Sequence, residues 1–239
     1  MTRVARLAVD HVGLVVADLA ASIAAFRTVG FQVSDPVALM TVDSDGRTTP
    51  LGQDSAHIIL ENAYIEISAP RPGTGNHLEP YLAFGPGLRI LCLASDDLVA
   101  DHIALSDLAA SSVVASTRVV RLRGGDRNAR FRWCSIRADF WPGILVAVVE
   151  HLDRDIVFTR ELREHPNGAR RLTKVTVAPG APTLARLAAA LHVEDTALAP
   201  ALEVGLPASL QRLPRLDISA GQLVSVIIGN CCIETHTRH

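Results

Sequence analysis

The segment LAVDHVGLVVADLAASIAAFRTVGFQV, residues 7–33, decides the fold. Its first eleven residues are rich in β-branched side chains and predict a strand, after which Asp18 can cap a helix. Apolar residues then recur at helical spacing, at Leu19, Ile23 and Phe26. Gly30 suits the position just past a helix end, where a left-handed backbone is common. We expect a strand to resume over residues 31–33.

The following residues complete a small unit. Residues 42–53 are rich in Asp, Ser, Gly and Thr and predict a polar loop. Residues 57–68, HIILENAYIEIS, predict two strands joined by a tight turn at Glu61 and Asn62. The order is therefore a strand, a helix and two or three further strands.

The same order recurs along the chain. Residues 88–94 predict a strand and Asp97 can cap a helix, and the further strand candidates are 113–114, 119–123, 130–136 and 144–152. A third, shorter copy has a strand at 172–178, a helix at 183–191 and a closing strand region at 224–235. Each unit is too small to bury a sheet face alone, so the copies should pack together. We expect paired modules, at about 7–70 and 86–153, within residues 1–160. A connector and the third module should fill 161–239.

Composition narrows the function. The 239 residues are 49% hydrophobic with a formal net charge of −2, whereas a general nucleic-acid binder would be strongly basic. No apolar run reaches the length of a membrane span, and no signal peptide is recognised. We expect a cytoplasmic protein. The four cysteines lack zinc-site spacing, which favours apolar roles over reactive thiols. No phosphate-binding loop or dinucleotide fingerprint predicts a nucleotide cofactor.

A strand–helix–strand–strand–strand unit with His in its first strand and Glu in its last resembles the vicinal oxygen chelate superfamily. The resemblance rests on residues 7–12, 17–19, 30–31 and 64–67. Residues 149–151 (VEH) and 164–169 (EHPNGA) are similar to those of bacterial glyoxalase-like domain proteins. The resemblance implies an α+β fold in which repeated βαβββ modules form curved mixed sheets around a cavity. Because the superfamily holds lyases, isomerases, dioxygenases and metal-free binding proteins, fold alone does not settle function.

The resemblance also implies one divalent metal, held by a ligand from the first and last strand of each module. His11, Glu66 and Glu150 match these positions, with Glu150 also able to act as a catalytic base. Neutral His with carboxylates would suit Zn, Fe, Mn or Ni. Gly13 beside His11 would leave room for a ligand. The substrate would be a small oxygenated metabolite with neighbouring oxygens.

The second module departs from the pattern, because Arg89 stands where its histidine is expected and a guanidinium cannot ligate a metal. The alternative is a metal-free cavity that binds or sequesters a small molecule, with Arg89 supplying positive charge. Further candidates for substrate binding are His57, Tyr64 and His151. His151 should face away from Glu150 unless a bulge shifts the register. His11 could instead be a core-edge histidine, and the cavity could be filled by side chains.

Two further features leave alternatives open. Residues 118–137 contain seven arginines around a predicted turn at 124–126, and Arg121 and Arg123 share one strand face. They form either an anion clamp or, as we favour, a solvated hairpin face. The third module has no partner in the chain, so we expect a homodimer.

Overall fold

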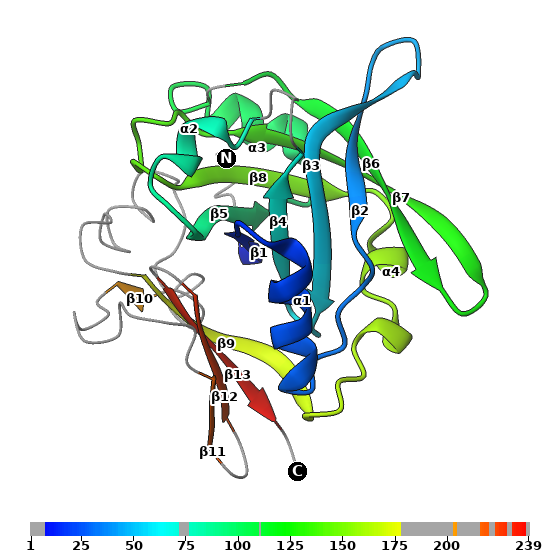
Figure 1. The fold of residues 1–239 in the computed structure, drawn as a ribbon. Coiled ribbons are helices and arrows are strands. Elements are labelled where there is room, and N and C mark those ends of the chain that lie inside the picture. Colours follow the sequence, from blue (N-terminus) through cyan, green and yellow to red (C-terminus); the bar gives the residue numbers. More distant parts are fainter. Residues whose placement is uncertain are drawn as a thin grey trace.

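The computed structural model describes residues 8–71, 77–109, 111–177, 203–204, 216–219, 223–228 and 231–237. Eight strands close into a barrel, and five further strands form a separate sheet beside it (Figure 1). Within the described residues, no helix is long and apolar enough to cross a membrane.

The first module comprises β1 (Ala8–Val15), α1 (Leu19–Thr28), β2 (Val37–Val42), β3 (Thr48–Ile59) and β4 (Tyr64–Pro70). The Asp18 carboxylate accepts from the Ala21 N–H at 2.9 Å, as an N-cap should, and Gly30 has φ +81° just past the helix. The expected strand at 31–33 does not form.

The expected loop at 42–53 is wrong in most of its length, because β2 and β3 pair as a hairpin. Only residues 43–47 lie outside the two strands. The Asp43 carboxylate accepts from the backbone N–H groups of Asp45 and Arg47, which closes the turn locally. Threonines and other polar residues can continue a strand wherever one face meets solvent.

The second module repeats this order. It contains α2 (Glu79–Leu82), β5 (Gly87–Ala94), α3 (Leu98–Ala104), β6 (Val114–Leu122), β7 (Gly125–Ser135) and β8 (Leu145–His151). The candidates at 113–114 and 119–123 therefore belong to one strand, β6. Two short helical turns follow, α4 (Arg154–Val157) and η1 (Arg160–Leu162).

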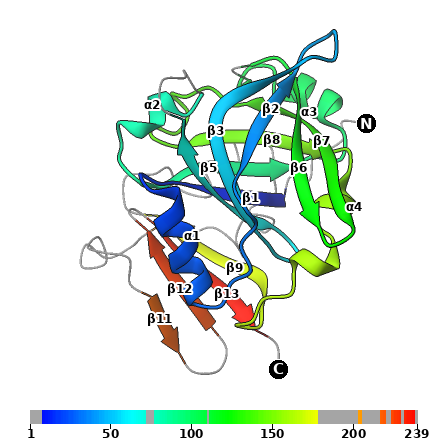
Figure 2. The ribbon, with the colours of Figure 1, turned by 45° about the vertical axis from the view of Figure 1, so that its right-hand side comes forward.

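The barrel order is β1-β4-β3-β2-β6-β7-β8-β5, with β5 returning to β1. β1 pairs with β4 in parallel and β5 pairs with β8 in parallel, while the remaining neighbours are antiparallel. The two modules thus make equivalent halves that meet at the β1–β5 and β2–β6 pairs. Figure 2 shows the strands curving around a common interior.

The separate sheet has the order β10-β9-β13-β12-β11. Its strands are β9 (Ala169–Val177), β10 (Glu203–Val204), β11 (Leu216–Ser219), β12 (Leu223–Ile228) and β13 (Cys231–Thr237). The helix expected at 183–191 lies outside the described residues. Asn62, in the β3–β4 turn, both donates to the Leu172 carbonyl and accepts from its N–H, so the barrel and β9 are tied together.

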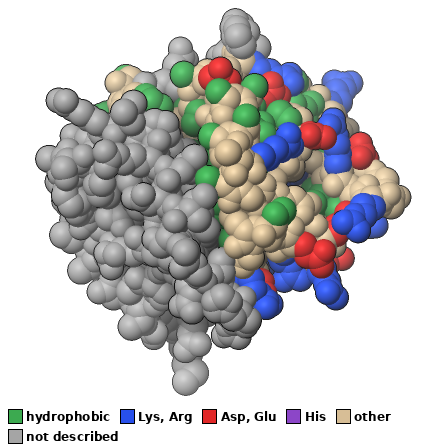
Figure 3. Space-filling view, turned by 60° about the horizontal axis from the view of Figure 1, so that its bottom comes forward, with side chains coloured by type: hydrophobic (Ala, Val, Ile, Leu, Met, Phe, Trp, Pro, Cys, Tyr) green, Lys and Arg blue, Asp and Glu red, His purple; other side chains and the backbone are tan. Residues whose placement is uncertain are grey.

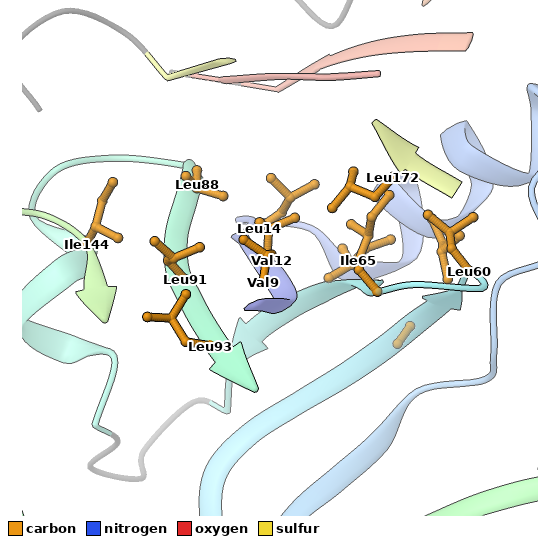
Figure 4. Close-up of a cluster of buried hydrophobic side chains, with 14 of the residues drawn as sticks. Val9, Val12, Leu14, Leu60, Ile65, Leu88, Leu91, Leu93, Ile144 and Leu172 are labelled. Atoms are coloured by element: carbon orange, nitrogen blue, oxygen red, sulfur yellow. The ribbon is translucent and has the colours of Figure 1, made fainter. Parts of the chain in front are cut away.

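A large cluster of buried hydrophobic residues lies outside the barrel lumen, between the strands and the elements that cover them. Val9, Val12 and Leu14 project from β1 into this cluster, where Leu172 of β9 also packs (Figure 4). All four side chains are buried, with exposed fractions of 8% or less. Because these side chains face outward, the inward face of β1 is left for other residues.

Candidate functional site

The barrel lumen forms an open pocket whose empty space, including solvent at its mouth, is about 640 Å³. Its polar wall comes from the first module and includes His11, Gln53, Ser55, His57, Tyr64 and Glu66. The second module contributes a mainly apolar wall, with Ile90, Phe131, Trp133, Leu145 and Ala147, and one charged residue, Arg118. Val37, Ala38 and Leu39 of β2 add apolar surface from the first module.

A β-bulge in β1 brings together the side chains of two consecutive residues, Asp10 and His11. In the pairing with β5, Val9 lies opposite Leu93 but His11 lies opposite Cys92, so Asp10 is the extra residue. Regular alternation would point Asp10 away from His11. Instead Asp10 Oδ1 lies 2.8 Å from His11 Nδ1. The bulge thus gives His11 a carboxylate partner that the sequence analysis misses.

Asp10 also contacts the second module. Its Oδ1 lies 3.1 Å from His151 Nε2, and its Oδ2 lies 3.5 Å from Arg154 Nη1. Burial alone would raise the pKa of Asp10, but the charge of His151 and the hydrogen bonds from both histidines hold it well below its usual range. Asp10 is therefore an ionised acceptor that fixes His11 Nδ1 as a donor and leaves Nε2 directed elsewhere.

His11 Nε2 faces Glu66 on the adjacent strand β4, 3.5 Å from Oε2. The other oxygen of Glu66, Oε1, accepts from three side chains. These donors are Gln53 (3.1 Å), Ser55 (3.0 Å) and Ser68 (2.5 Å). The carboxylate is therefore fixed in orientation, and the oxygen not held by these donors is the one beside His11. This pair can hold or move a proton at the lumen wall.

Aromatic and neutral groups surround the pair. The ring of Tyr64 stacks on that of His11, with centroids 4.2 Å apart, and His57 meets the same tyrosine edge-on. Burial and the charge of Arg118 lower the pKa of His57 well below its usual value, and burial lowers the pKa of His77 to about 4. Both histidines are therefore neutral near pH 7.

Of the described residues that line the lumen, Arg118 is the one arginine or lysine. It projects inward from β6, is 5% exposed, and its guanidinium lies 5.0 Å from the centroid of the Tyr64 ring. By its position in the sequence, Arg118 belongs to the arginine-rich hairpin of residues 118–137. The alternation of side chains along a strand could have identified Arg118 as inward-facing. It shares a strand face with Val120 and Leu122, opposite to Arg121 and Arg123.

Arg89 lies on the opposite face of its strand from the lumen. Its guanidinium donates to backbone carbonyls of the nearby loops, including Gly85 at 2.8 Å and Gly143 at 3.3 Å. The lumen-facing residues of β5 are Ile90 and Cys92. Arg89 therefore serves to hold loops together, and the positive charge that we expected from it in the cavity comes from Arg118.

Glu150 also lies away from the lumen. Its Oε2 accepts from the Leu98 N–H at 3.1 Å, at the start of α3, and lies 2.5 Å from Arg132 Nη2. Leu145, Ala147 and Val149 are the β8 residues that line the cavity, and Glu150 lies on the outer face. The structure therefore does not bring Glu150 to His11 and Glu66. His151, by contrast, reaches Asp10, and its ring meets that of Phe158 edge-on.

Strand register shows which residues of the second module correspond to His11 and Glu66. Gly13, two residues after His11, lies opposite Glu66 in the β1–β4 ladder. In the same way Cys92, two residues after Ile90, lies opposite Ala147 in the β5–β8 ladder. The counterparts of His11 and Glu66 are therefore Ile90 and Ala147, neither of which can bind a metal.

The residues present do not fit a protein-held divalent metal. His11 Nε2 and Glu66 Oε2 are two donors, and nowhere in the described ranges do three His, Cys, Asp or Glu side chains form a group that could hold an ion. Catalytic zinc sites use three protein ligands. The space beside Gly13 is also occupied, because a Cβ there would lie 2.6 Å from Ile90 Cβ. The room that we expected for a ligand is thus filled by Ile90.

The arginine-rich hairpin is mostly paired with acids. Arg130 contacts Asp153 at 2.8 Å, Arg121 contacts Asp35 at 3.4 Å, and Arg132 contacts Glu150. Figure 3 shows basic and acidic side chains interspersed over the described part of one face. Exposed pairs of this kind contribute little to stability. Apart from Arg118, these contacts are those of a solvated hairpin face.

Comparison with known proteins identifies related folds. The family model described as a glyoxalase-like domain matches residues 9–192. A hypothetical protein from Staphylococcus aureus superposes with a TM-score of 0.53 at 12% identity, covering 92% of this chain and 81% of that one. No curated protein matches the chain in sequence.

Methylmalonyl-CoA epimerases also match in structure. The enzyme from Streptomyces coelicolor, solved with 2-nitronate-propionyl-CoA, gives a TM-score of 0.42 at 19% identity and covers 61% of this chain and 97% of its own. The enzyme from Mycobacterium tuberculosis gives 0.42 at 22% identity, with 64% and 95% covered. At these identities the likeness concerns the fold alone.

Proposed function

Because this chain belongs to the glyoxalase-like domain family, we propose that its lumen binds a small oxygenated metabolite without a protein-held metal. The observation that carries the proposal is that the lumen combines a cluster of polar side chains, including His11, Ser55 and Glu66, with an apolar wall that includes Ile90, Phe131 and Trp133. Such a cavity favours a ligand with an apolar body and an oxygen-bearing end.

The polar wall is organised for oxygen atoms. Ser55 and Gln53 hold Glu66, and Asp10 holds His11, so these groups keep their orientation before a ligand enters. Preorganised donors and acceptors bind with less loss of conformational freedom. The apolar wall offers Phe131 and Trp133 as flat surfaces for the ligand body.

A second candidate function is proton transfer on the bound metabolite, as in an isomerase or lyase. Its support is the chain of contacts from Asp10 through His11 to Glu66. Asp10 orients the imidazole, Nε2 of which faces the lumen together with Glu66 Oε2. Either atom could accept a proton from an acidic C–H or O–H of the ligand. A metal, which family members commonly use, has no complete ligand set here among the described residues.

Binding can be followed through Trp133, one of the two tryptophans and the one that lines the lumen. We expect small aromatic alcohols, ketones and acids to change its fluorescence. The Ala147→Phe variant should fill the cavity and abolish the change, whereas Ala115→Phe, on an exposed position of β6, should not. Ala147→Val provides a milder block, and circular dichroism checks folding. Equal binding by the wild type and both Ala147 variants would contradict the proposal.

Two expectations remain predictions, namely a cytoplasmic location and a homodimer. Sedimentation velocity of the full chain tests the second: a mass of one chain at micromolar concentration would contradict it.

A further inference from the structure

We propose that the ligand of the lumen carries a carboxylate and that Arg118 is its anchor. This inference rests on the proposed function, and it adds the chemical class of the ligand. Arg118 differs from the other arginines of the β6–β7 hairpin in its position and its contacts.

The strand geometry places Arg118 inside the barrel. It follows Ser116 on the inward face of β6, and the residue opposite it on β7 is the small, fully buried Ala129. A small residue at this position leaves space for the long side chain to lie in the lumen. Arg118 also lines a second cavity of about 360 Å³, which shares His57 with the first, so the guanidinium stands at the junction of the two.

Arg118 has no acid partner among the residues that the structure describes: no carboxylate there lies within 4 Å of its nitrogens, and no acceptor there takes a hydrogen bond from them. Arg121, Arg130 and Arg132 on the same hairpin each contact an acid, although they are more exposed. A buried charge is costly unless it is paired and hydrogen-bonded. An anionic group of a ligand can therefore supply the ion pair that the described residues do not provide.

The surroundings favour a carboxylate over other anions. The central carbon of the guanidinium lies over the Tyr64 ring, and none of its N–H groups is donated to another described residue, so they can serve a planar, bidentate acceptor. Burial raises the pKa of Tyr64, so its hydroxyl stays protonated, and His57 is neutral. Arg118 is thus the one full positive charge among these three groups. A dianionic phosphate would meet a single cation and the negative charge of Glu66 in the same cavity.

The placement also sets the ligand's orientation. With its carboxylate on Arg118, the apolar body extends along Phe131 and Trp133, which line the same cavity. Phe131 lies opposite Ser116 in the β6–β7 ladder, two residues from Arg118. A ligand whose apolar body is a flat or branched group of modest size fits this arrangement.

The test compares matched probes on the full chain by Trp133 fluorescence and calorimetry. The acids are acetate, phenylacetate and 4-phenylbutyrate, the neutral partners are their amides, and phenyl phosphate is the dianion. We expect an aryl acid to bind roughly tenfold to a hundredfold more tightly than its amide, as for a lost charged hydrogen-bonded pair. Arg118→Gln should remove that preference. Arg127→Gln, which removes an exposed arginine of the same hairpin, should keep it.

A stability measurement separates an anchor from a structural arginine. Arg118→Met should leave the melting temperature of the ligand-free protein unchanged or higher, because an unpaired buried charge is removed. Arg89→Met should lower it by roughly 5 °C, because Arg89 donates to several carbonyls. A loss in Arg118→Met as large as in Arg89→Met would overturn the inference.

The binding outcomes distinguish the two levels of the proposal. If acids and amides bind equally and Arg118→Gln changes neither, the anchor fails while lumen binding stands. Tighter binding of phenyl phosphate than of phenylacetate would assign the site to phosphates and also overturn the carboxylate. If no probe binds the wild type, the anchor and the lumen site both fail.

Discussion

Asp10 and His11 are consecutive in the sequence, yet their side chains meet, with Asp10 Oδ1 2.8 Å from His11 Nδ1. Neighbouring residues of a regular strand point to opposite faces, so this contact exists because of the bulge in the β1–β5 ladder. The bulge sits where the two modules meet, and through Asp10 it links His11 of the first module to His151 of the second.

Replacing Asp10 by Asn should lower the free energy of unfolding by about 3 kcal/mol at pH 7, since a buried acceptor of two histidines is weakened. The pKa of Asp10 is held below its usual 3.8, so this contribution is present above pH 3.8 and is lost only as the pH falls through the lower folded value. Urea unfolding of both proteins at pH 7, 5 and 3 measures the difference. A difference that disappears already between pH 7 and 5 would contradict this account.

Acid should destabilise the protein between pH 6.5 and about 4 through His77. Burial lowers its pKa from 6.5 to about 4, so on acidification the unfolded chain binds the proton first. The loss amounts to about 3 kcal/mol, at 1.36 kcal/mol per pKa unit, and levels off below the folded value. His77→Gln should reduce the slope of the stability profile over this range, leaving the part that comes from His57 and His165, whose pKa values burial also lowers. His102→Gln, on α3 outside the lumen, is the control for the change of residue type.

Gly13→Ala should destabilise the barrel by about 1–3 kcal/mol, because its Cβ would lie 2.6 Å from Ile90 Cβ. The nearest atom is the Cβ of Ile90, which every residue except glycine carries. Only glycine at position 90 therefore removes the clash. In a double-mutant cycle, Gly13→Ala with Ile90→Gly should cost less than the sum of the single changes, by about 1 kcal/mol or more. Strict additivity would show that the two residues do not compete for this space.

The symmetry of the two modules predicts how a metal site could be created. Ile90→His with Ala147→Glu places ligands at the counterparts of His11 and Glu66. Titration calorimetry should show Zn²⁺ binding to this variant roughly 100-fold more tightly than to the wild type, since four ligands replace two. Adding His11→Gln should weaken the gained binding. Equally tight, one-to-one Zn²⁺ binding by the wild type would show that its own residues already form a site.

Glu150→Gln should affect the fold and leave ligand binding unchanged. Glu150 accepts from the Leu98 N–H and contacts Arg132, so we expect a loss of about 1 kcal/mol in stability. Glu66→Gln provides the contrast, because Glu66 lines the lumen and its change should weaken binding of an oxygenated probe. A loss of probe binding in Glu150→Gln without unfolding would return Glu150 to the site.

The sequence by itself determined the modules and one side of the lumen. The α1 caps at Asp18 and Gly30, the β3–β4 turn, and the inward face of β1 and β4 follow from local patterns of polar and apolar residues. These patterns suffice because helix capping and strand alternation act within a few residues.

Only the tertiary structure decided the second module's side of the lumen. Residues 88–94 are apolar on both faces, because one face meets the core and the other the cavity, so alternation could not show that Ile90 and not Arg89 points inward. For the same reason, the sequence pattern of β8 predicted that Glu150 points into the lumen, whereas the structure places Ala147 there. The bulge at Asp10 depends on pairing with a strand about 80 residues away, and the isolation of Arg118 from acids depends on every strand around it. Such features arise from register and closure of the barrel, which a local pattern does not encode.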